Sequence, residues 1–454
     1  MNFLGIDISL KNVPCLDIGF IPIGVFNREF LKQAQIPITI CIERDEGKKA
    51  VYDTYITGTN HEADKYYVQR LVKYLLWAKG GFRVHIYGSD DMADYIREVF
   101  SSSPEAKYNF DNGFMSKIYE QPFEVVSAKT KPVENEVSRR VGGNTDGYRI
   151  GFDAGGSDRK VSAVINGQAI FSEEIVWHPK TESNPDYHFE GIVDAMKKAA
   201  SKMPRVDSIG VSSAGIYINN RTMAASLFLK VPQEDFDKKV KDIYIRATKE
   251  IGDVPLTVVN DGDVTALVGA MAFDDNNVLG IAMGTSQAAG YIDENGNIKG
   301  WLNELAFCPV DASPHAMEDE WSGDIGCGVK YFSQDGVIKL ATKAGIELTH
   351  YESPGEKLKY IQELLVDDND ADLVRNIFRS IGCYLGHTLP YYWDLYKFKH
   401  VLLLGRVMSG EGGDLILNEA KVVLADEYPE YSFNIHTPDE KTRRVGQSVA
   451  AASL

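Results

Sequence analysis

Apolar and polar residues alternate with two different periods along this chain, which predicts strands interleaved with helices. Polar and apolar residues alternate over 160–165, and the apolar segment 148–152 precedes them across a short turn. Further apolar runs predict strands at 206–213, 255–259, 277–283 and 401–404. Segments with helical spacing, which alternate with these strands, predict helices at 189–203, 236–251, 264–272, 414–426 and 443–452. Two more short strands are expected at 291–293 and 298–301. This order predicts a layered α/β protein with a largely parallel sheet.

The first 128 residues carry a pattern of their own. A hairpin is expected from 36–43 and 50–57, a helix over 62–78, a strand over 83–87 and a second helix over 90–100, with Ser89 as its N-cap. Residues 129–147 are poor in apolar side chains and rich in turn formers, which is typical of a linker. The sequence therefore predicts an additional N-terminal α/β domain, 1–128, and a linker, 129–147.

Composition narrows the possible functions. The 454 residues suggest about two to four domains. The net charge of −17 argues against nucleic acid as a partner, because binding its phosphates requires a basic surface. The five cysteines are scattered, no apolar run is long enough to span a membrane, and the first residues do not resemble a secretion signal. We therefore expect a cytoplasmic protein without a membrane or nucleic-acid partner.

Four loops rich in small residues follow strands, at 153–157, 260–261, 284–290 and 405–413. Ligands of α/β sheets bind beyond the carboxyl ends of strands. Gly155 and Gly156 lack a Cβ atom and can take positive φ, so a phosphate could approach their backbone. Asp153 could hold Mg²⁺ through water. The alternatives are a Gly-Gly hairpin without a ligand, and a type I turn at Asn260 that caps the next helix.

The order and separation of these loops resemble those of the ROK family of sugar kinases and sugar-responsive regulators. The resemblance covers about 148–454 and implies an actin-like ATPase (ribonuclease H-like) core of two duplicated subdomains. These would be 148–259, completed by the C-terminal helix 443–454, and 260–442. It also implies ATP and Mg²⁺ as cofactors and a sugar as the phosphoryl acceptor.

The resemblance implies a role for each loop. Asp261 would be the general base, since a sugar hydroxyl is a poor nucleophile and a carboxylate that takes its proton gives roughly 10²–10⁴ in rate. Asn260 and Glu304 would bind sugar hydroxyls, with Ser213 and Gly215 as further candidates at the end of strand 206–213. The phosphate and adenosine loops would be formed by Asp153 (also near Mg²⁺), Gly155, Gly156, Ser157, Gly284, Thr285 and Ser286 with Gly290, and by Gly405, Ser409 and Gly410.

The sequence departs from the family pattern in two places. Gln287, Ala288 and Ala289 stand where the second phosphate loop usually has glycines. Phe307 replaces the family's zinc-ligating histidine, and Cys327 alone remains of its cysteines, so no zinc is expected. The nearby His315 and Glu318 are expected at the surface.

Three functions remain open. The first is an ATP-dependent kinase of a hexose-type sugar, with Asp261 as base. The second is a non-catalytic sugar sensor or regulator of the ROK type, and the third is an ATPase that acts on a partner through residues 1–128. In each case a homodimer is the expected assembly.

Overall fold

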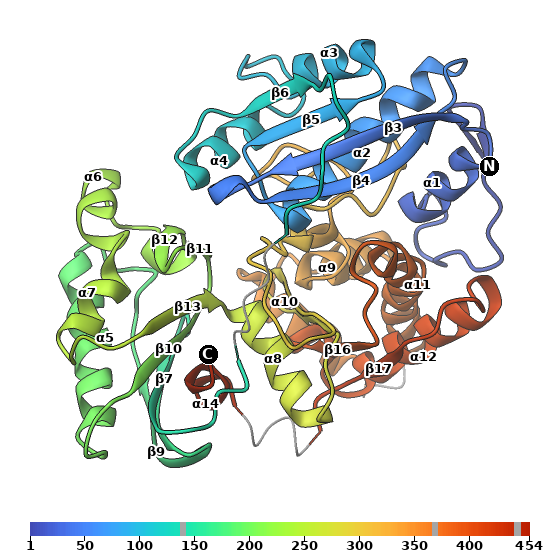
Figure 1. Ribbon diagram of the computed structural model, residues 1–454. Coiled ribbons are helices and arrows are strands. Elements are labelled where there is room, and N and C mark those ends of the chain that lie inside the picture. Colours follow the sequence, from blue (N-terminus) through green and yellow to red (C-terminus); the bar gives the residue numbers. More distant parts are fainter. Residues whose placement is uncertain (137–141, 366–370, 440–445) are drawn as a thin grey trace.

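The computed structural model describes residues 1–136, 142–365, 371–439 and 446–454. It contains an N-terminal part and two lobes, each built on its own sheet (Figure 1). The first lobe begins at β7 (Tyr148–Ala154), and the second lobe follows β13 (Leu256–Asn260). No helix among the described residues is both long and apolar enough to cross a membrane.

The N-terminal part contains a four-stranded sheet in the order β4-β3-β5-β6. The predicted hairpin is confirmed as β3 (Ile36–Glu43) and β4 (Lys49–Ile56), and the predicted strand as β5 (Arg83–Tyr87). The two predicted helices are α2 (His61–Lys79) and α3 (Asp90–Val99), and Ser89 caps α3 by accepting a hydrogen bond from the Met92 N–H. The sequence did not predict α1 (Ile23–Leu31), α4 (Asn109–Tyr119) or β6 (Glu124–Ser127).

The first lobe has a five-stranded sheet in the order β13-β10-β7-β8-β9. β7 forms an antiparallel meander with β8 (Asp158–Ile165) and β9 (Gln168–Val176), while β10 (Ser208–Ser213) and β13 continue the sheet in parallel. The small ribbon of β11 (Ile216–Ile218) and β12 (Arg221–Ala224) projects from it. The helices are α5 (Pro185–Ala200), α6 (Gln233–Asp235) and α7 (Ile243–Lys249).

One predicted helix of the first lobe is wrong. Instead of a single helix over 236–251, a short π-helical segment, Phe236–Val240, is followed by α7. The break lies at Lys241, whose carbonyl accepts a hydrogen bond from the Thr222 N–H on β12. A tertiary contact therefore takes the backbone acceptor that a continuous helix would have used.

The second lobe has a four-stranded sheet in the order β15-β14-β16-β17. β14 (Val278–Met283) pairs antiparallel with β15 (Gln287–Ile292) and parallel with β16 (His400–Leu404), and β17 (Asn434–His436) lies at the edge. Its helices are α8 (Asp261–Phe273), α9 (Gln334–Lys343), α10 (Pro354–Glu363), α11 (Ala371–Tyr396) and α12 (Gly410–Glu427). The chain closes on α14 (Gln447–Ala452); residues 443–445 of the helix predicted there lie outside the described residues.

Two predicted strands of this lobe need correction. The strand predicted at 291–293 is the end of β15, which already begins at Gln287. Residues 298–301 form no strand, because the Lys299 and Gly300 carbonyls accept hydrogen bonds from the Arg44 side chain of the N-terminal part, at 3.3 and 2.8 Å. The backbone is thereby held in an irregular path.

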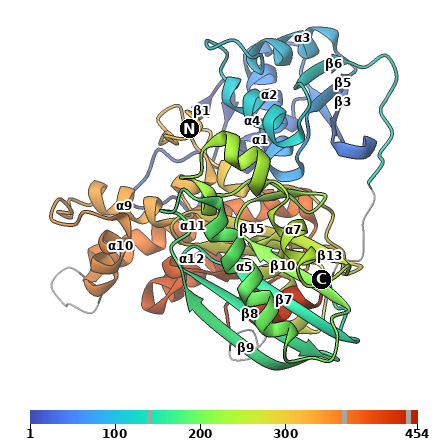
Figure 2. The ribbon, with the colours of Figure 1, turned by 90° about the vertical axis from the view of Figure 1, so that its left-hand side faces the viewer.

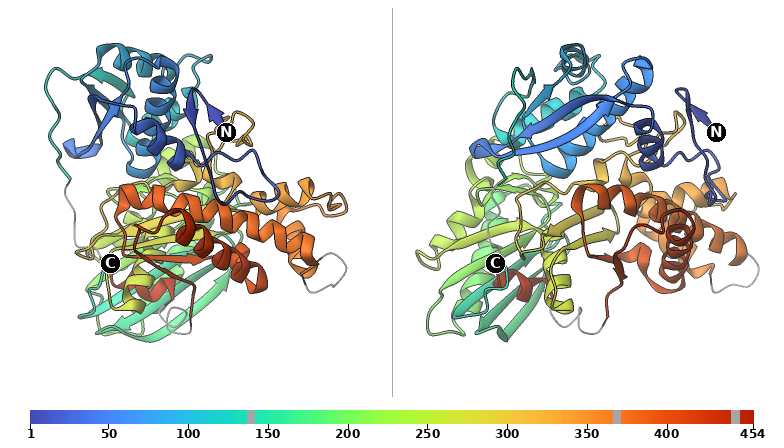
Figure 3. Two further views of the ribbon diagram at one scale, coloured as in Figure 1. Left: turned by 90° about the vertical axis from the view of Figure 1, so that its right-hand side faces the viewer. Right: turned by 45° about the vertical axis from the view of Figure 1, so that its right-hand side comes forward.

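The N-terminal part packs against the second lobe and shares one continuous apolar core with it. It lies over the orange and red helices of that lobe (Figure 3), whereas the first lobe has a separate core. The segment after β6 runs down one side of the molecule towards the first lobe (Figure 2). α14 packs against β7 and β10 of the first lobe, and a Cβ atom on Gly151 of β7 would lie 1.7 Å from the Ser448 carbonyl oxygen. The exact domain boundaries stay a prediction.

Candidate active site

A cavity of about 670 Å³ is lined by all three parts of the molecule. The first lobe contributes the β11–β12 ribbon and the segment up to Phe236, and the second lobe contributes the start of α8 and Ser286–Ala288. The N-terminal part contributes Trp77 of α2 and two side chains of α4. Among the predicted site residues, Gly215, Asn260, Asp261, Ser286 and Glu304 line this cavity.

Asp261 is the first residue of α8 and follows β13 directly. The helix begins three residues before the predicted start because Asn260 caps it: its Oδ1 accepts a hydrogen bond from the Gly262 N–H at 2.7 Å. The Asn260 Nδ2 donates to the Gly215 carbonyl, also at 2.7 Å. The Asx cap that the sequence left as an alternative is thus present, and it holds the half-buried Asp261 carboxylate at the cavity.

Three further carboxyl groups surround Asp261. Burial raises the pKa of Glu304 to about 8, with the charges of Asp261 and Asp263 adding to the effect. Burial also raises the pKa of Asp263 to about 7 and that of Asp153 to about 6, against hydrogen bonds from Asn303 and Ser212 respectively. The pKa of Asp261 is raised by burial too, although backbone N–H groups and Lys180 oppose the rise. Part of this cluster therefore holds a proton near neutral pH.

The first phosphate turn takes a different backbone conformation from the one expected. Neither Gly155 nor Gly156 has a positive φ. A Cβ atom on Gly155 would lie 2.7 Å from the Asp158 carbonyl oxygen, and one on Gly156 would lie 2.7 Å from the Lys180 Cε. The turn therefore leaves little space for a side chain at both positions. Ser157 is exposed in the same turn, and its hydroxyl donates to Asp158 at 3.0 Å.

Lys180 is a residue that the sequence analysis missed. It is exposed, its ammonium group lies beside Gly156, and its charge reaches Asp261. A cation in this position acts on both the turn that would bind phosphate and the predicted base. A single lysine in a turn has no distinguishing sequence signal, so only the folded chain identifies it.

The other two loops meet each other. Gly284, Thr285 and Ser286 connect β14 to β15, and Gly405 follows β16. Gly405 has φ +106°, and a Cβ atom there would lie 2.3 Å from the Met283 carbonyl oxygen, so the loops touch at a point where only glycine fits. Ser409 is the N-cap residue of α12 and Gly410 its first residue.

Two residues assigned to the site by resemblance have packing roles. Ser213 is buried, and its hydroxyl accepts hydrogen bonds from Tyr217 at 2.7 Å and Tyr244 at 2.9 Å, which places it inside the first lobe and off the cavity wall. Gly290 lies within β15 instead of the loop. A Cβ atom on it would be 2.1 Å from the Gly262 carbonyl carbon, so it allows α8 to start close to β15.

The N-terminal part positions Glu304 directly. The Glu304 and Asn303 N–H groups donate to the carbonyls of Trp77 and Ala78, at 3.0 and 2.9 Å, in the last turn of α2. Asn303 in turn donates to the Asp263 carboxylate at 2.9 Å. The backbone of α2 therefore orders the acidic side of the cavity, a role that the sequence did not indicate for residues 1–128.

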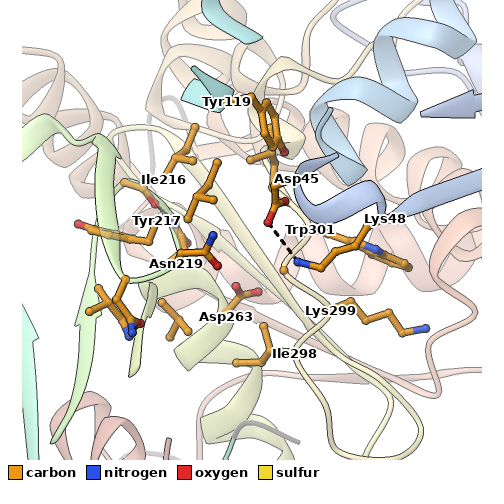
Figure 4. Close-up of a pocket in the computed structure, with 18 residues that line it drawn as sticks. Asp45, Lys48, Tyr119, Ile216, Tyr217, Asn219, Asp263, Ile298, Lys299 and Trp301 are labelled. Atoms are coloured by element: carbon orange, nitrogen blue, oxygen red, sulfur yellow. Dashed lines mark hydrogen bonds and ion pairs between the residues drawn. The ribbon is translucent and has the colours of Figure 1, made fainter. Parts of the chain in front are cut away.

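Asn260 also lines a smaller cavity of about 190 Å³, which Figure 4 shows. Gly215 and Asn260 line both cavities, and Asp263 lines the smaller one. Asp45 and Lys48, which form an ion pair at 3.1 Å, belong to the N-terminal part and face the first-lobe loop that carries Asn219. All three parts of the chain therefore meet here as well.

A buried ion-pair network holds the segment around Cys327. Arg70 of α2 donates to both Asp324 carboxylate oxygens at 2.8 and 2.6 Å, and Lys73 pairs with Asp324 and Asp111 at 3.3 and 2.9 Å. In the part of the chain that is described, no group of three or more His, Cys, Asp and Glu side chains is arranged to hold a metal. His315 and Glu318 are exposed, as predicted.

No protein-family model matches this sequence, and no curated protein matches it. Among solved structures, a ROK hexokinase from Thermus thermophilus is similar over 67% of this chain and 96% of its own, with a TM-score of 0.53 and 16% identity. A ROK family transcriptional regulator, a homologue of the E. coli MLC protein, is similar over 80% of this chain and 87% of its own, with a TM-score of 0.50 and 14% identity.

These similarities confirm the predicted fold class. The hexokinase matches 67% of this chain, which corresponds to a core of two α/β lobes. The part of the chain that it does not match is consistent with an extra N-terminal region. The chain therefore has the fold of the ROK sugar kinases and regulators, an actin-like α/β core that is extended at its N-terminal side.

Proposed function

We propose that this protein is an ATP-dependent kinase that transfers the γ-phosphoryl group of ATP to a hydroxyl of a sugar. The observation that carries the proposal is the position of Asp261: its carboxylate starts a helix at the end of a strand and lines a cavity shared by both lobes. A carboxylate so placed can accept the proton of a bound hydroxyl as it attacks phosphorus.

The other groups of the cavity support this chemistry. Glu304, with its pKa of about 8, can donate or accept a hydrogen bond at a second sugar hydroxyl. Lys180, beside the glycine turn, can neutralise charge on the transferred phosphoryl group. The walls of the cavity come from three parts of the chain, and their closure over a bound sugar would exclude water, which favours transfer over hydrolysis.

The residues present fit a magnesium ion next to the nucleotide. Asp153 is a half-buried carboxylate whose pKa is raised by burial and also by the charge of Asp261. Such an excess of negative charge favours a cation, and Asp153 would hold Mg²⁺ through water. When bound, Mg²⁺ would neutralise phosphate charge; orientation of the hydroxyl and removal of its proton are assigned to this chain's own residues.

A coupled assay of ADP release over a panel of sugars tests the proposal. Asp261→Asn is expected to lower kcat by about 10²–10⁴ while the sugar still raises the melting temperature. Asp274→Asn, at the opposite end of α8, is the matched control and should keep full activity. ADP release that does not depend on a sugar would favour an ATPase. A sugar that raises the melting temperature without any turnover would favour a ROK-type sensor.

A further inference from the structure

Aromatic rings dominate one side of the large cavity. Trp77, Phe114, Phe307 and Trp321 line it, and their ring centroids are 4.6 to 5.3 Å apart along the series Phe307–Trp77, Trp77–Phe114, Phe114–Trp321 and Phe307–Trp321. Two of these residues come from the N-terminal part and two from the second lobe. The fold thus assembles a continuous aromatic wall next to Glu304.

Two large apolar side chains of this cavity are open to solvent. Trp321 is 52% exposed and Leu229, contributed by the first lobe, is 70% exposed. Exposing such side chains gains nothing for folding, and apolar surface gathered at one concave place is typical of a binding site. The two residues belong to different lobes, so a ligand in the cavity can contact both.

Most of the polar groups that could bind a sugar come from the second lobe. Both ends of the Asn260 amide already have hydrogen-bond partners, which leaves Asp261, Glu304, Ser286 and the buried, unpartnered Gln287 amide as candidates for sugar hydroxyls, with Ser226 in the first lobe. A bare hexose carries hydroxyls around its whole ring, and those facing the aromatic wall would lack partners, at a cost of roughly 1–3 kcal/mol each in general. About 670 Å³ is also in the range of cavities that enclose drug-sized ligands.

We infer that the substrate is a glycoside with an apolar, ring-sized aglycone. Its sugar would reach Asp261 and Glu304, and its aglycone would lie between the aromatic wall and Leu229. This inference rests on the proposed function, which assigns a sugar to the end of the cavity at Asp261 and Glu304. It also means that the N-terminal part, together with the lobes, determines which substrate is bound. Burying one phenyl ring is expected to improve affinity at least tenfold.

Matched pairs of methyl and phenyl β-glycosides of glucose, galactose, mannose and N-acetylglucosamine test the inference. Binding is measured by calorimetry, and turnover by ADP release, with the full-length protein. For at least one sugar, the phenyl glycoside should bind ten times more tightly or better. Trp321→Ala should remove most of that preference, because it lowers the affinity for the phenyl glycoside more than the affinity for the methyl glycoside. Tyr55→Ala, which truncates a 48% exposed ring on β4, should change neither value.

Two results would overturn the inference: equal affinities within every pair, or no binding of any glycoside. A phenyl preference that survives Trp321→Ala and also Leu229→Ala would overturn the placement of the aglycone. If phenyl glycosides bind with the expected preference but are never phosphorylated, the inference about the cavity holds and the kinase proposal fails. Phosphorylation of a free sugar with no gain from the phenyl group would instead support the kinase proposal and overturn the inference about the aglycone.

Discussion

The buried pair of Arg70 and Asp324 gives the sharpest test of how the N-terminal part supports the site. Both side chains are almost fully buried, at 3% and 4% exposure, and they join α2 to the segment that carries Trp321 and Cys327. Burial would raise the pKa of Asp324, but Arg70 and Lys73 outweigh it and hold that pKa well below its usual value. The carboxylate is therefore charged in the interior and depends on its partners.

Removing one partner of a buried pair typically costs 3–5 kcal/mol, because the other charge stays buried without compensation. Arg70→Met removes two hydrogen bonds to Asp324, one to the Ile325 carbonyl and a longer one to the Tyr108 hydroxyl. Lys73 remains 3.3 Å from the carboxylate, so we expect the lower end of that range, about 3 kcal/mol. The double variant Arg70→Met, Asp324→Leu leaves no unpaired charge at this position and should recover most of the loss.

Urea unfolding at pH 7 measures these free energies. Lys238→Met is the control, because its ion pair with Glu234 is exposed at 68% and 78% and should be worth no more than about 0.5 kcal/mol. A cost below about 1 kcal/mol for Arg70→Met would refute the reasoning. So would a double variant as unstable as the sum of the single ones, since that would mean that the two side chains act independently.

The remaining predictions concern the site. The pKa of Glu304 is about 8 in the folded state against 4.5 ordinarily, so its contribution to stability is complete below about pH 4.5 and is lost as the pH rises towards 8. Glu304→Gln should therefore flatten the fall in melting temperature over that range, and an unchanged slope would contradict the assignment. Gly405→Ala should lower the affinity for ATP severalfold, measured by calorimetry, because a Cβ atom would strike the Met283 carbonyl at a φ of +106°. Unaltered ATP affinity would argue against this loop as the adenosine site. Glu120→Gln weakens its exposed pairs with Arg221 and Lys241 of the first lobe, and it should change stability by less than about 1 kcal/mol. A larger loss would mean that these pairs hold the N-terminal part to the first lobe.

The sequence by itself determined the local framework of the site. The apolar run 255–259 followed by Asn260 and Asp261 predicts a strand with a carboxylate at its end, and both are present; the cap at Asn260, which the sequence offered as an alternative, is present as well. The hairpin β3–β4 and the cap at Ser89 were likewise readable, because each depends on residues close together in the chain. The glycines of the four loops were found too, although the reason for Gly155 and Gly156 is space and not a positive φ.

Only the tertiary structure decided what surrounds that carboxylate. Arg70 and Asp324 are 254 positions apart, and the carbonyl of Trp77 meets the N–H of Glu304 across a similar distance in the chain. Periodicity reports which face of an element is buried, but not which other element covers it. Segments that are distant in the chain bring the aromatic rings together and place Lys180 beside Gly156. The pKa of Glu304 is raised by burial and by the charges of Asp261 and Asp263. For that physical reason they could be assigned only once the chain was folded.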